Sequence, residues 1–255
     1  MTLRPAATVA SLTFREVLRR KVQVNLLLFG AVLIAGSFLV SELTIGEMHR
    51  ILADLGLSAM QLIGTLIAVF VGSSLVAGDV ERRVLYPLIA KPVSRTQYLM
   101  GRYLGLAAAL IVNLAVMAAV LAAVLVLESR SLRPLDAPLA AAVALQGVQF
   151  LAVGAVAVLF SAITTTTLAA TFSLAIAVAG QLTNEMRALW QGPATWLPRA
   201  LWYLLPNLGA LNANDAVIYR TPPPASTWVA ALYGLLYAAT AVVLAALVFE
   251  RRDLR

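Results

Sequence analysis

The feature that most constrains this chain is a series of long runs that contain no charged residue. The first three are residues 22–41, 55–78 and 103–127, which are 20, 24 and 25 residues long. A helix needs about 20 apolar residues to cross a hydrocarbon core, so each run is long enough to span a membrane. The strands of an outer-membrane barrel would instead alternate apolar and polar residues over about ten positions. The runs therefore predict an all-α integral membrane protein.

Composition excludes the other broad classes of protein. Hydrophobic residues make up 61% of the 255 residues and charged residues 12%. A soluble domain carries about 45–50% apolar and about 25% charged residues. A disordered chain would need low hydrophobicity and high charge, which is the opposite composition.

The runs divide into six predicted spans in a single transmembrane domain, 1–255. Two of the spans come from one uncharged stretch of 48 residues, 137–184, which is too long for one crossing. We place the turn between them at Ser161 and Thr164–Thr167. The six spans are at about residues 22–41, 56–78, 103–127, 138–160, 165–183 and 228–249.

Lysine and arginine on the cytoplasmic side set the orientation of a membrane protein. With both termini inside, thirteen of these residues fall on the inner side and six on the outer side. We therefore expect a multi-pass protein of the inner (plasma) membrane with both termini cytoplasmic. The same bias explains the net charge of +7 without a nucleic-acid partner. The turn near Ser161 carries no charge, so a five-span alternative, with the C-terminal tail outside, stays open.

The sequence lacks the residues that catalytic, cofactor and metal sites require. It has no cysteine, and its one histidine, His49, falls in the predicted outer loop 43–57, where we interpret it as a solvated side chain. No HExxH, GxSxG or phosphate-loop motif occurs. The predicted spans contain no Asp, Glu, Lys, Arg or His, which disfavours ion-coupled transport. Hydrogen bonding between helices explains their strongest polar residues most simply; these are Asn25, Gln61, Asn113, Gln146, Gln149 and Gln181.

Residues 5–21 are predicted to form a basic amphipathic interface helix before the first span. Phe14 and Leu18 lie on its apolar face, and Arg15 and Arg19 lie off that face. Such a helix lies along the inner leaflet, held by its apolar face and by attraction to anionic membrane lipid. Passive anchoring and docking of another protein both stay open for it.

The inner loop 79–102, DVERRVLYPLIAKPVSRTQYLMGR, mixes charged and apolar residues in an unusual way. A short helix can form across it and end before Pro92, because the residue before a proline is pushed out of helical geometry. An ordinary hydrophilic loop would not need this mixture, whereas a helix that inserts into a groove of a soluble protein would. The residues that make up the pattern are Asp79, Glu81, Arg82, Arg83, Leu85, Leu88, Pro92 and Arg95.

All four tryptophans lie in or beside the predicted outer segment, 185–226. They are Trp190, Trp196, Trp202 and Trp228. Because tryptophan prefers the membrane–water interface, we interpret this segment as interfacial or re-entrant helices. Anchoring and a functional role are equally open for it.

The order of these segments resembles the type-2 ATP-binding-cassette (ABC) permease family over the whole chain. The resemblance is sharpest at residues 81–101, where Glu-Arg-Arg precedes Leu-x-x-Leu and Lys-Pro-Val-Ser-Arg. It extends to Leu205-Pro206-Asn207-Leu208 and to FERRDL at residues 249–254, and is closest to the subgroup with permeases of copper-enzyme maturation and gliding. The chain departs from the family at residues 83–85, where Arg-Val-Leu replaces the usual glycine and threonine.

The resemblance implies a six-span protomer that forms a homodimer and is driven by two cytoplasmic ABC ATPase subunits. ATP and magnesium would be bound by those subunits, and no cofactor, metal or catalytic site is expected on this chain. The loop after the second span would act as the coupling helix. Glu81, Arg82 and Arg83, with the segment through Pro92 and Arg95, would contact the ATPase, flanked by residues 14–20.

Our main hypothesis is the permease subunit of an exporter-type complex. The alternative is a subunit that relays ATPase motion through the outer segment to a periplasmic protein and translocates no substrate. Uncharged spans favour a lipid-like cargo or none. A membrane-bound enzyme is disfavoured, because no nucleophile–base set is visible. Gly101 and Gly105 have GxxxG spacing, which suits packing against a second protomer or within one chain.

Overall fold

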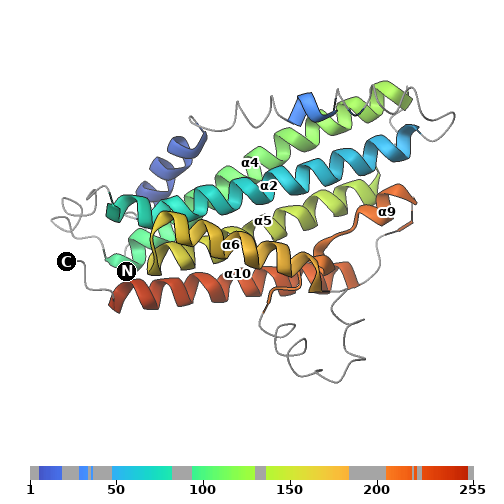
Figure 1. The fold of residues 1–255 in the computed structure, drawn as a ribbon. Helices are drawn as coiled ribbons and strands as arrows, with labels where there is room; N and C mark the ends of the chain where they lie inside the picture. Colours follow the sequence, from blue (N-terminus) through green and yellow to red (C-terminus); the bar gives the residue numbers. More distant parts are fainter. Residues whose placement is uncertain are drawn as a thin grey trace, which may run out of the picture.

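The computed structural model describes residues 6–18, 29–33, 36, 48–81, 94–129, 136–183, 205–219, 221–222 and 226–251. Within these ranges every regular element is a helix. The long helices run side by side as a bundle (Figure 1); they are α2 (Met48–Glu81), α4 (Arg95–Ser129), α5 (Ala137–Ile163), α6 (Thr166–Gln181) and α10 (Ser226–Arg251). The short helices η2 (Gly209–Leu211) and α9 (Asn214–Ile218) lie between α6 and α10 in the sequence. Residues 6–18 form a further helix.

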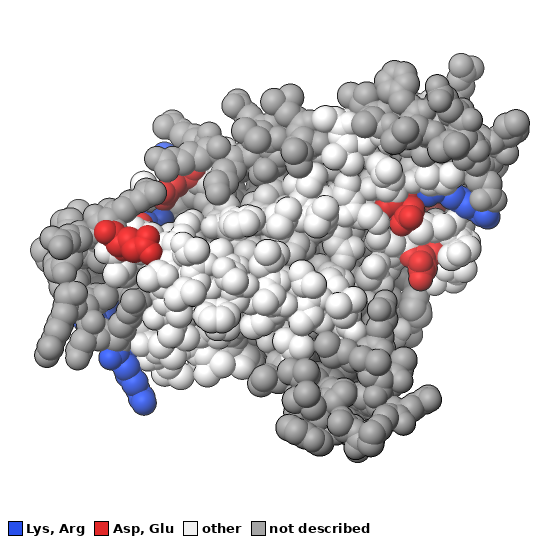
Figure 2. Space-filling model, in the orientation of Figure 1, with Lys and Arg blue, Asp and Glu red and all other residues white. Residues whose placement is uncertain are grey.

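Four of the described helices, α2, α4, α5 and α10, are long and apolar enough to cross a membrane. Helix α6 is apolar but shorter, with 16 residues. Charged side chains gather toward the two ends of the molecule, and the band between them is uncharged on the face in Figure 2. These features confirm an all-α, multi-pass membrane protein. The count of six spans stays a prediction, because only residues 29–33 and 36 of the first predicted span are described.

Helix α5 contacts all four of the other long helices, and it is buried along most of its length. Small side chains allow α2 to approach it closely. A Cβ added to Gly72 of α2 would lie 2.7 Å from the Ala157 Cβ and 3.3 Å from the Gly154 carbonyl oxygen. Helices in membranes pack through such small residues. Gly72 therefore holds the C-terminal third of α2 against α5.

The connection between α5 and α6 is a turn of two residues, Thr164-Thr165. Helix α5 ends at Ile163 and α6 begins at Thr166, within the stretch from which the sequence predicts the turn. The two helices then fold back on each other. Phe160 and Phe172 pack across this pair with ring centroids 5.6 Å apart.

The structure extends α2 into the predicted outer loop 43–57. Helix α2 begins at Met48, so residues 48–57 are helical. Leu52 and Leu57 are buried there, because they continue the apolar face of the span. Arg50 and Asp54 lie on the first turns of this helix, and both sit outside the uncharged run that was used to place the span.

The predicted inner loop 79–102 is likewise helical at both of its ends. Helix α2 continues to Glu81 and α4 begins at Arg95. The Gln97 backbone N–H donates to the Ser94 Oγ at 3.2 Å, and the Ser94 N–H donates to the Gln97 Oε1 at 3.3 Å. This reciprocal pair is a capping box, which fixes the first turn of α4. The connection between α2 and α4 is therefore no longer than residues 82–94.

Candidate functional site

One end of the bundle gathers the helix ends that the predicted coupling loop joins. Helix α2 finishes there at Glu81 and α4 starts there at Arg95, near residues 6–18 and the end of α10 (Figure 1). We call this the Arg102 end, and the opposite end, beside α9, the α9 end. Of the predicted coupling residues, Asp79, Glu81 and Arg95 are described. The others lie outside the described residues: Arg82, Arg83, Leu85, Leu88 and Pro92.

Arg102 of α4 joins three segments of the chain at this end. Its guanidinium forms an ion pair with Asp79 of α2. Its Nη1 donates to the Glu16 Oε2 at 3.0 Å and to the Thr13 Oγ1 at 3.3 Å, both in helix 6–18. Its Nε donates to the Tyr98 hydroxyl at 3.2 Å, and that hydroxyl donates to Asp79. One cation therefore ties α2, α4 and the N-terminal helix together.

The two carboxylates that face Arg102 differ in their exposure to solvent. The side chains of Arg102 and Asp79 are 12% and 15% exposed, whereas that of Glu16 is 51% exposed. A mostly buried pair is costly to break, since the remaining charge is left without a partner. An exposed pair contributes at most about 1 kcal/mol. Asp79 is therefore the carboxylate whose loss would destabilise the contacts of Arg102 most.

Two glycines bring helix 6–18 against the start of α4. A Cβ added to Gly101 would lie 2.7 Å from the Val9 Cβ, and one added to Gly105 would lie 2.5 Å from the Thr13 Cβ and 2.6 Å from the Ala10 carbonyl oxygen. The GxxxG pair thus packs within one chain. A side chain at either glycine would separate the two helices.

The predicted residues of the interface helix take different positions on it. Phe14 is half-buried and packs against the core, Leu18 is half-buried, and Arg15 is exposed. Arg19 lies outside the described residues. The helix therefore buries its apolar face partly against its own chain.

Glu81, predicted to contact an ATPase, bonds to the start of α6 in this structure. Its Oε1 accepts from the Thr166 backbone N–H at 2.9 Å and its Oε2 accepts from the Thr166 Oγ1 at 3.1 Å. The N-cap residue of α6, Thr165, makes no side-chain capping bond of its own. Glu81 supplies the cap instead, and its charge suits the positive end of the helix dipole.

Arg95 connects the start of α4 to the last turn of α10. Its Nη1 donates to the Glu250 carbonyl oxygen at 3.2 Å. Nearby, the rings of Tyr98 and Phe249 stack with centroids 6.1 Å apart. Both residues that flank the 82–94 connection, Glu81 and Arg95, are thus bonded to helices other than the ones that carry them.

A cavity of about 290 Å³ lies beside these contacts. Glu16, Asp79, Glu81 and Arg102 supply its charged wall, and residues of α2 from Val71 to Gly78 supply much of the remainder. Among the described residues, no group of three or more side chains could hold a metal ion. The contacts described at this end are ion pairs and helix caps.

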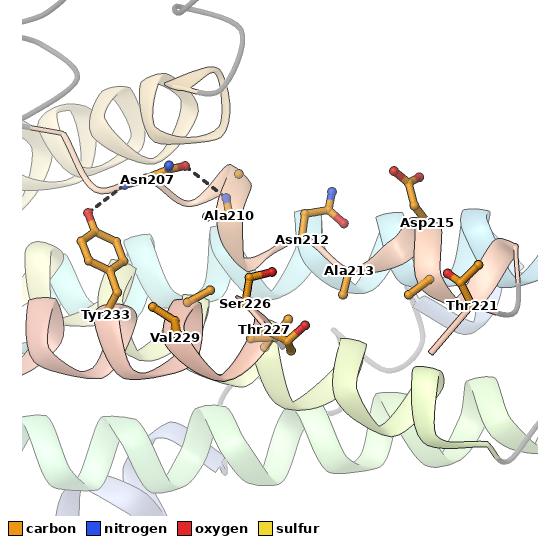
Figure 3. Close-up of a pocket in the computed structure, with 14 residues that line it drawn as sticks. Asn207, Ala210, Asn212, Ala213, Asp215, Thr221, Ser226, Thr227, Val229 and Tyr233 are labelled. Atoms are coloured by element: carbon orange, nitrogen blue, oxygen red, sulfur yellow. Dashed lines mark hydrogen bonds between the residues drawn. The ribbon is translucent and has the colours of Figure 1, made fainter. Parts of the chain in front are cut away.

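At the α9 end, the predicted outer segment 185–226 is described at residues 205–219, 221–222 and 226. The predicted outer residues Trp190, Trp196 and Trp202 lie outside the described residues. Asn207 anchors the described part, because its N–H donates to the Tyr233 hydroxyl at 3.1 Å (Figure 3).

A second, larger cavity of about 850 Å³ opens between residues 207–221 and the first turns of α10 (Figure 3). Leu145, Val229 and Ala230 give it apolar surface, and Asp215 carries the one charge among its lining residues in the described part of the chain. Its volume is within the range of small-molecule sites. It could accept an amphipathic molecule or a segment of another protein.

Three of the polar side chains that were predicted to join helices do so, Gln61, Gln146 and Gln149, whereas Asn25 lies outside the described residues. The Gln61 Nε2 donates to the Gln149 Oε1 at 3.5 Å, and the Gln146 Nε2 donates to the Leu57 carbonyl oxygen at 3.0 Å. These bonds link α2 to α5. Asn113 differs, because its Nδ2 contacts the Met117 Sδ on its own helix at 3.7 Å.

Four residues of the Arg102 end were absent from the predicted site: Thr13, Glu16, Tyr98 and Arg102. Tyr98 and Arg102 are four apart, which places them on one helix face and is a usable sequence signal. Asp79 precedes Arg102 by 23 residues and Glu16 precedes it by 86. No local pattern reveals pairs at such separations.

A comparison with protein families matches residues 7–254 to the family described as ABC-2 family transporter protein. No curated protein matches the chain.

Proposed function

The chain belongs to the ABC-2 family of transporter proteins, and we propose that it works in an exporter, where its Arg102 end receives the motion of a cytoplasmic ATPase. Membership makes the chain a permease subunit of an ABC transporter, the membrane-spanning component that associates with ABC ATPase subunits. The chain itself is not expected to hydrolyse ATP. Two ATPase subunits bind ATP and magnesium, and a second copy of this chain completes the complex.

The observation that carries the proposal is the bonding at the two ends of the α2–α4 connection. Glu81 is bonded to α6 and Arg95 to α10. Asp79, two residues before Glu81, is bonded through Arg102 to helix 6–18. A displacement of the connection would therefore be transmitted to α6, α10 and helix 6–18 together. Packed helices with two discrete arrangements can carry such a displacement across a membrane.

The connection itself, residues 82–94, is the part that we assign to ATPase contact. Arg82, Arg83, Leu85, Leu88 and Pro92 lie outside the described residues. Their mixture of charged and apolar side chains suits a segment that inserts into a groove of the ATPase. Glu81 also caps α6 through its carboxylate, and its contact with the ATPase stays a prediction. The Arg102 end faces the cytoplasm of a cell whose inner membrane holds the chain, in agreement with the arginine and lysine bias.

The test compares two arginine variants in the native host. Arg82→Ala with Arg83→Ala removes the contact charges and leaves the Glu81 cap in place. The matched control is Arg50→Ala, which changes an exposed arginine at the other end of α2. Affinity purification should recover an ABC ATPase with the parent and the control, and markedly less with the double variant. Equal recovery and equal ATPase activity from all three would overturn the assignment.

The cavity at the α9 end favours a second candidate function. In this alternative the ATPase motion reaches residues 205–221 and rearranges a periplasmic protein bound there, with no substrate translocated. The open, mainly apolar cavity of about 850 Å³ is suited to a segment of such a partner. Crosslinking from Asp215→Cys in intact cells distinguishes the two, since a periplasmic protein would be captured only in the alternative.

A further inference from the structure

The structure assigns a positioning role to Ser161 of α5: its hydroxyl enters the hydrogen-bond ladder of α2 and makes residues 72–78 a hinge. We infer that the last turn of α2, which carries Asp79 and Glu81, bends at this hinge during the transport cycle. The inference rests on the proposed function, because it concerns how the motion of the ATPase enters the bundle.

The hydroxyl of Ser161 bonds to backbone groups that α2 would otherwise pair with each other. Its Oγ donates to the Ser73 carbonyl oxygen at 2.7 Å and accepts from the Ala77 N–H at 2.8 Å. It also accepts from the Val76 N–H at 3.1 Å. Ser73 and Ala77 are four residues apart, which is the spacing that one α-helical bond closes. A side chain inserted into this ladder is a recognised cause of helix kinks.

The sequence around the insertion, GSSLVAG at residues 72–78, weakens the helix further. The Ser73 Oγ donates to the Val69 carbonyl oxygen at 2.6 Å and the Ser74 Oγ donates to the Val71 carbonyl oxygen at 2.9 Å. Serine hydroxyls that bond back to their own helix in this way bend it. Gly/Ser pairs are also frequent at kinks.

The two glycines of this segment differ in what surrounds them. Gly72 is needed for packing, because a Cβ there would lie 2.7 Å from Ala157. A Cβ at Gly78 would meet no atom nearer than the Ser74 Cβ at 3.9 Å. Packing therefore gives no reason for glycine at position 78. Its effect is to lower the helix propensity of the turn after the insertion.

The surroundings of α2 also change at the insertion. Before it, Gly72 holds the helix tightly against α5. Alongside and after it, Ser74, Leu75, Gly78 and Asp79 line the cavity of about 290 Å³ at the Arg102 end, which begins at Val71. The end of α2 therefore has space on one side, whereas Gly72 is in close contact with α5.

The first experiment measures backbone hydrogen exchange in the purified full-length chain. In Ser161→Ala the Ser73 carbonyl and the Ala77 N–H lose a partner that competes with their own helical bond, so exchange at residues 76–78 should slow about fivefold. Gly78→Ala should slow the same amides, because alanine stabilises the helix and has room. If Ser161 only satisfied these groups and made no hinge, its removal would leave them without an acceptor. Faster exchange in Ser161→Ala would therefore overturn the inference.

The second experiment measures the ATPase activity of the assembled complex. Both variants should reduce the stimulation of the ATPase by the permease about fivefold, with the assembly intact. The matched control is Ser173→Ala, which removes another buried serine hydroxyl, one without a hydrogen-bond partner among the described residues. Full stimulation in both Ser161→Ala and Gly78→Ala would overturn the hinge. Failure of the unmodified chain to bind any ATPase would instead overturn the proposed function, and the exchange experiment would still test the hinge.

Discussion

At the scale of single residues, the ion pair of Arg102 and Asp79 contributes more to stability than any exposed charge of the same cluster. We expect Arg102→Met to lower the stability of the purified chain by about 3 kcal/mol, because it leaves a mostly buried carboxylate unpaired. Glu16→Gln should change stability by less than about 1 kcal/mol, since that side chain is 51% exposed. Thermal unfolding in detergent measures both changes.

The double variant Asp79→Leu with Arg102→Met provides the control for this prediction. Replacing both charges with apolar side chains should recover much of the stability, because no buried charge is left unpaired. The single variants Asp79→Leu and Arg102→Met are measured beside it. If the double variant loses as much stability as the two single variants added together, the loss comes from packing and the ion pair is not its source.

Glu81 gives a second prediction for a single residue. Glu81→Ala removes the cap of α6 and should cost about 1 kcal/mol of local stability. Hydrogen exchange at the first amides of α6, from Thr166 onward, should then become faster by about fivefold. Glu250→Ala is the matched control. Arg95 bonds to the backbone carbonyl of Glu250 and not to its carboxylate, so this substitution should leave exchange at the α6 amides unchanged. Unchanged exchange in Glu81→Ala would show that the cap does not hold the helix.

At the scale of elements, the packing of helix 6–18 depends on the absence of side chains at two positions of α4. Gly105→Leu adds a side chain at a position without room for one. A Cβ at residue 105 would lie 2.5 Å from the Thr13 Cβ and 2.6 Å from the Ala10 carbonyl oxygen. We expect the N-terminal helix to be displaced and Val17, which is 8% exposed, to become accessible. Because the chain has no cysteine, a single Val17→Cys can be labelled with maleimide to measure this.

Gly30→Leu is the matched control for this substitution. A Cβ at Gly30 would meet no atom within 4 Å, so a side chain there should not move helix 6–18. If Val17→Cys is labelled equally in both glycine variants, the glycines of α4 do not determine the position of this helix.

The middle of each long helix could be predicted from the sequence, but the ends of α2 and α4 could not be placed from charge alone. Asp54 and Asp79 bound an uncharged run, yet α2 continues past both of them. A helix can continue into polar surroundings wherever its apolar face stays buried, as at Leu52. The start of α4 had a usable signal, since Ser94 and Gln97 have capping-box spacing.

The contacts of the candidate site were beyond sequence reasoning for a different reason. Glu81 and Thr166 are 85 residues apart, and Ser73 and Ser161 are 88 apart. Such pairs depend on the relative rotation and depth of two packed helices, which small residues such as Gly72 determine. Local periodicity reports which face of a helix is apolar, and it carries no information on which partner meets that face.

At the scale of the whole molecule, the order of the helices decides which chain ends lie together. Helices α4, α5, α6 and α10 alternate in direction, so the C-terminal end of α10 returns to the end where α4 begins. The contact of Arg95 with the Glu250 carbonyl oxygen at 3.2 Å agrees with this arrangement. The five-span alternative would separate these two ends by the membrane. The described helices therefore bring the start of α4 and the last turn of α10 to the same end of the bundle.

The final prediction concerns the side of the membrane that each end faces. Single cysteines at Ser11 and Arg251 mark the Arg102 end, and one at Tyr219, which is 66% exposed, marks the α9 end. In intact cells a membrane-impermeant maleimide should label only Tyr219→Cys, and permeabilised cells should show labelling at all three positions. Labelling of Arg251→Cys but not Ser11→Cys in intact cells would mean that the two ends of the chain lie on opposite sides, as in the five-span alternative. Labelling of both in intact cells would place the Arg102 end outside, where no cytoplasmic ATPase could reach the connection between α2 and α4.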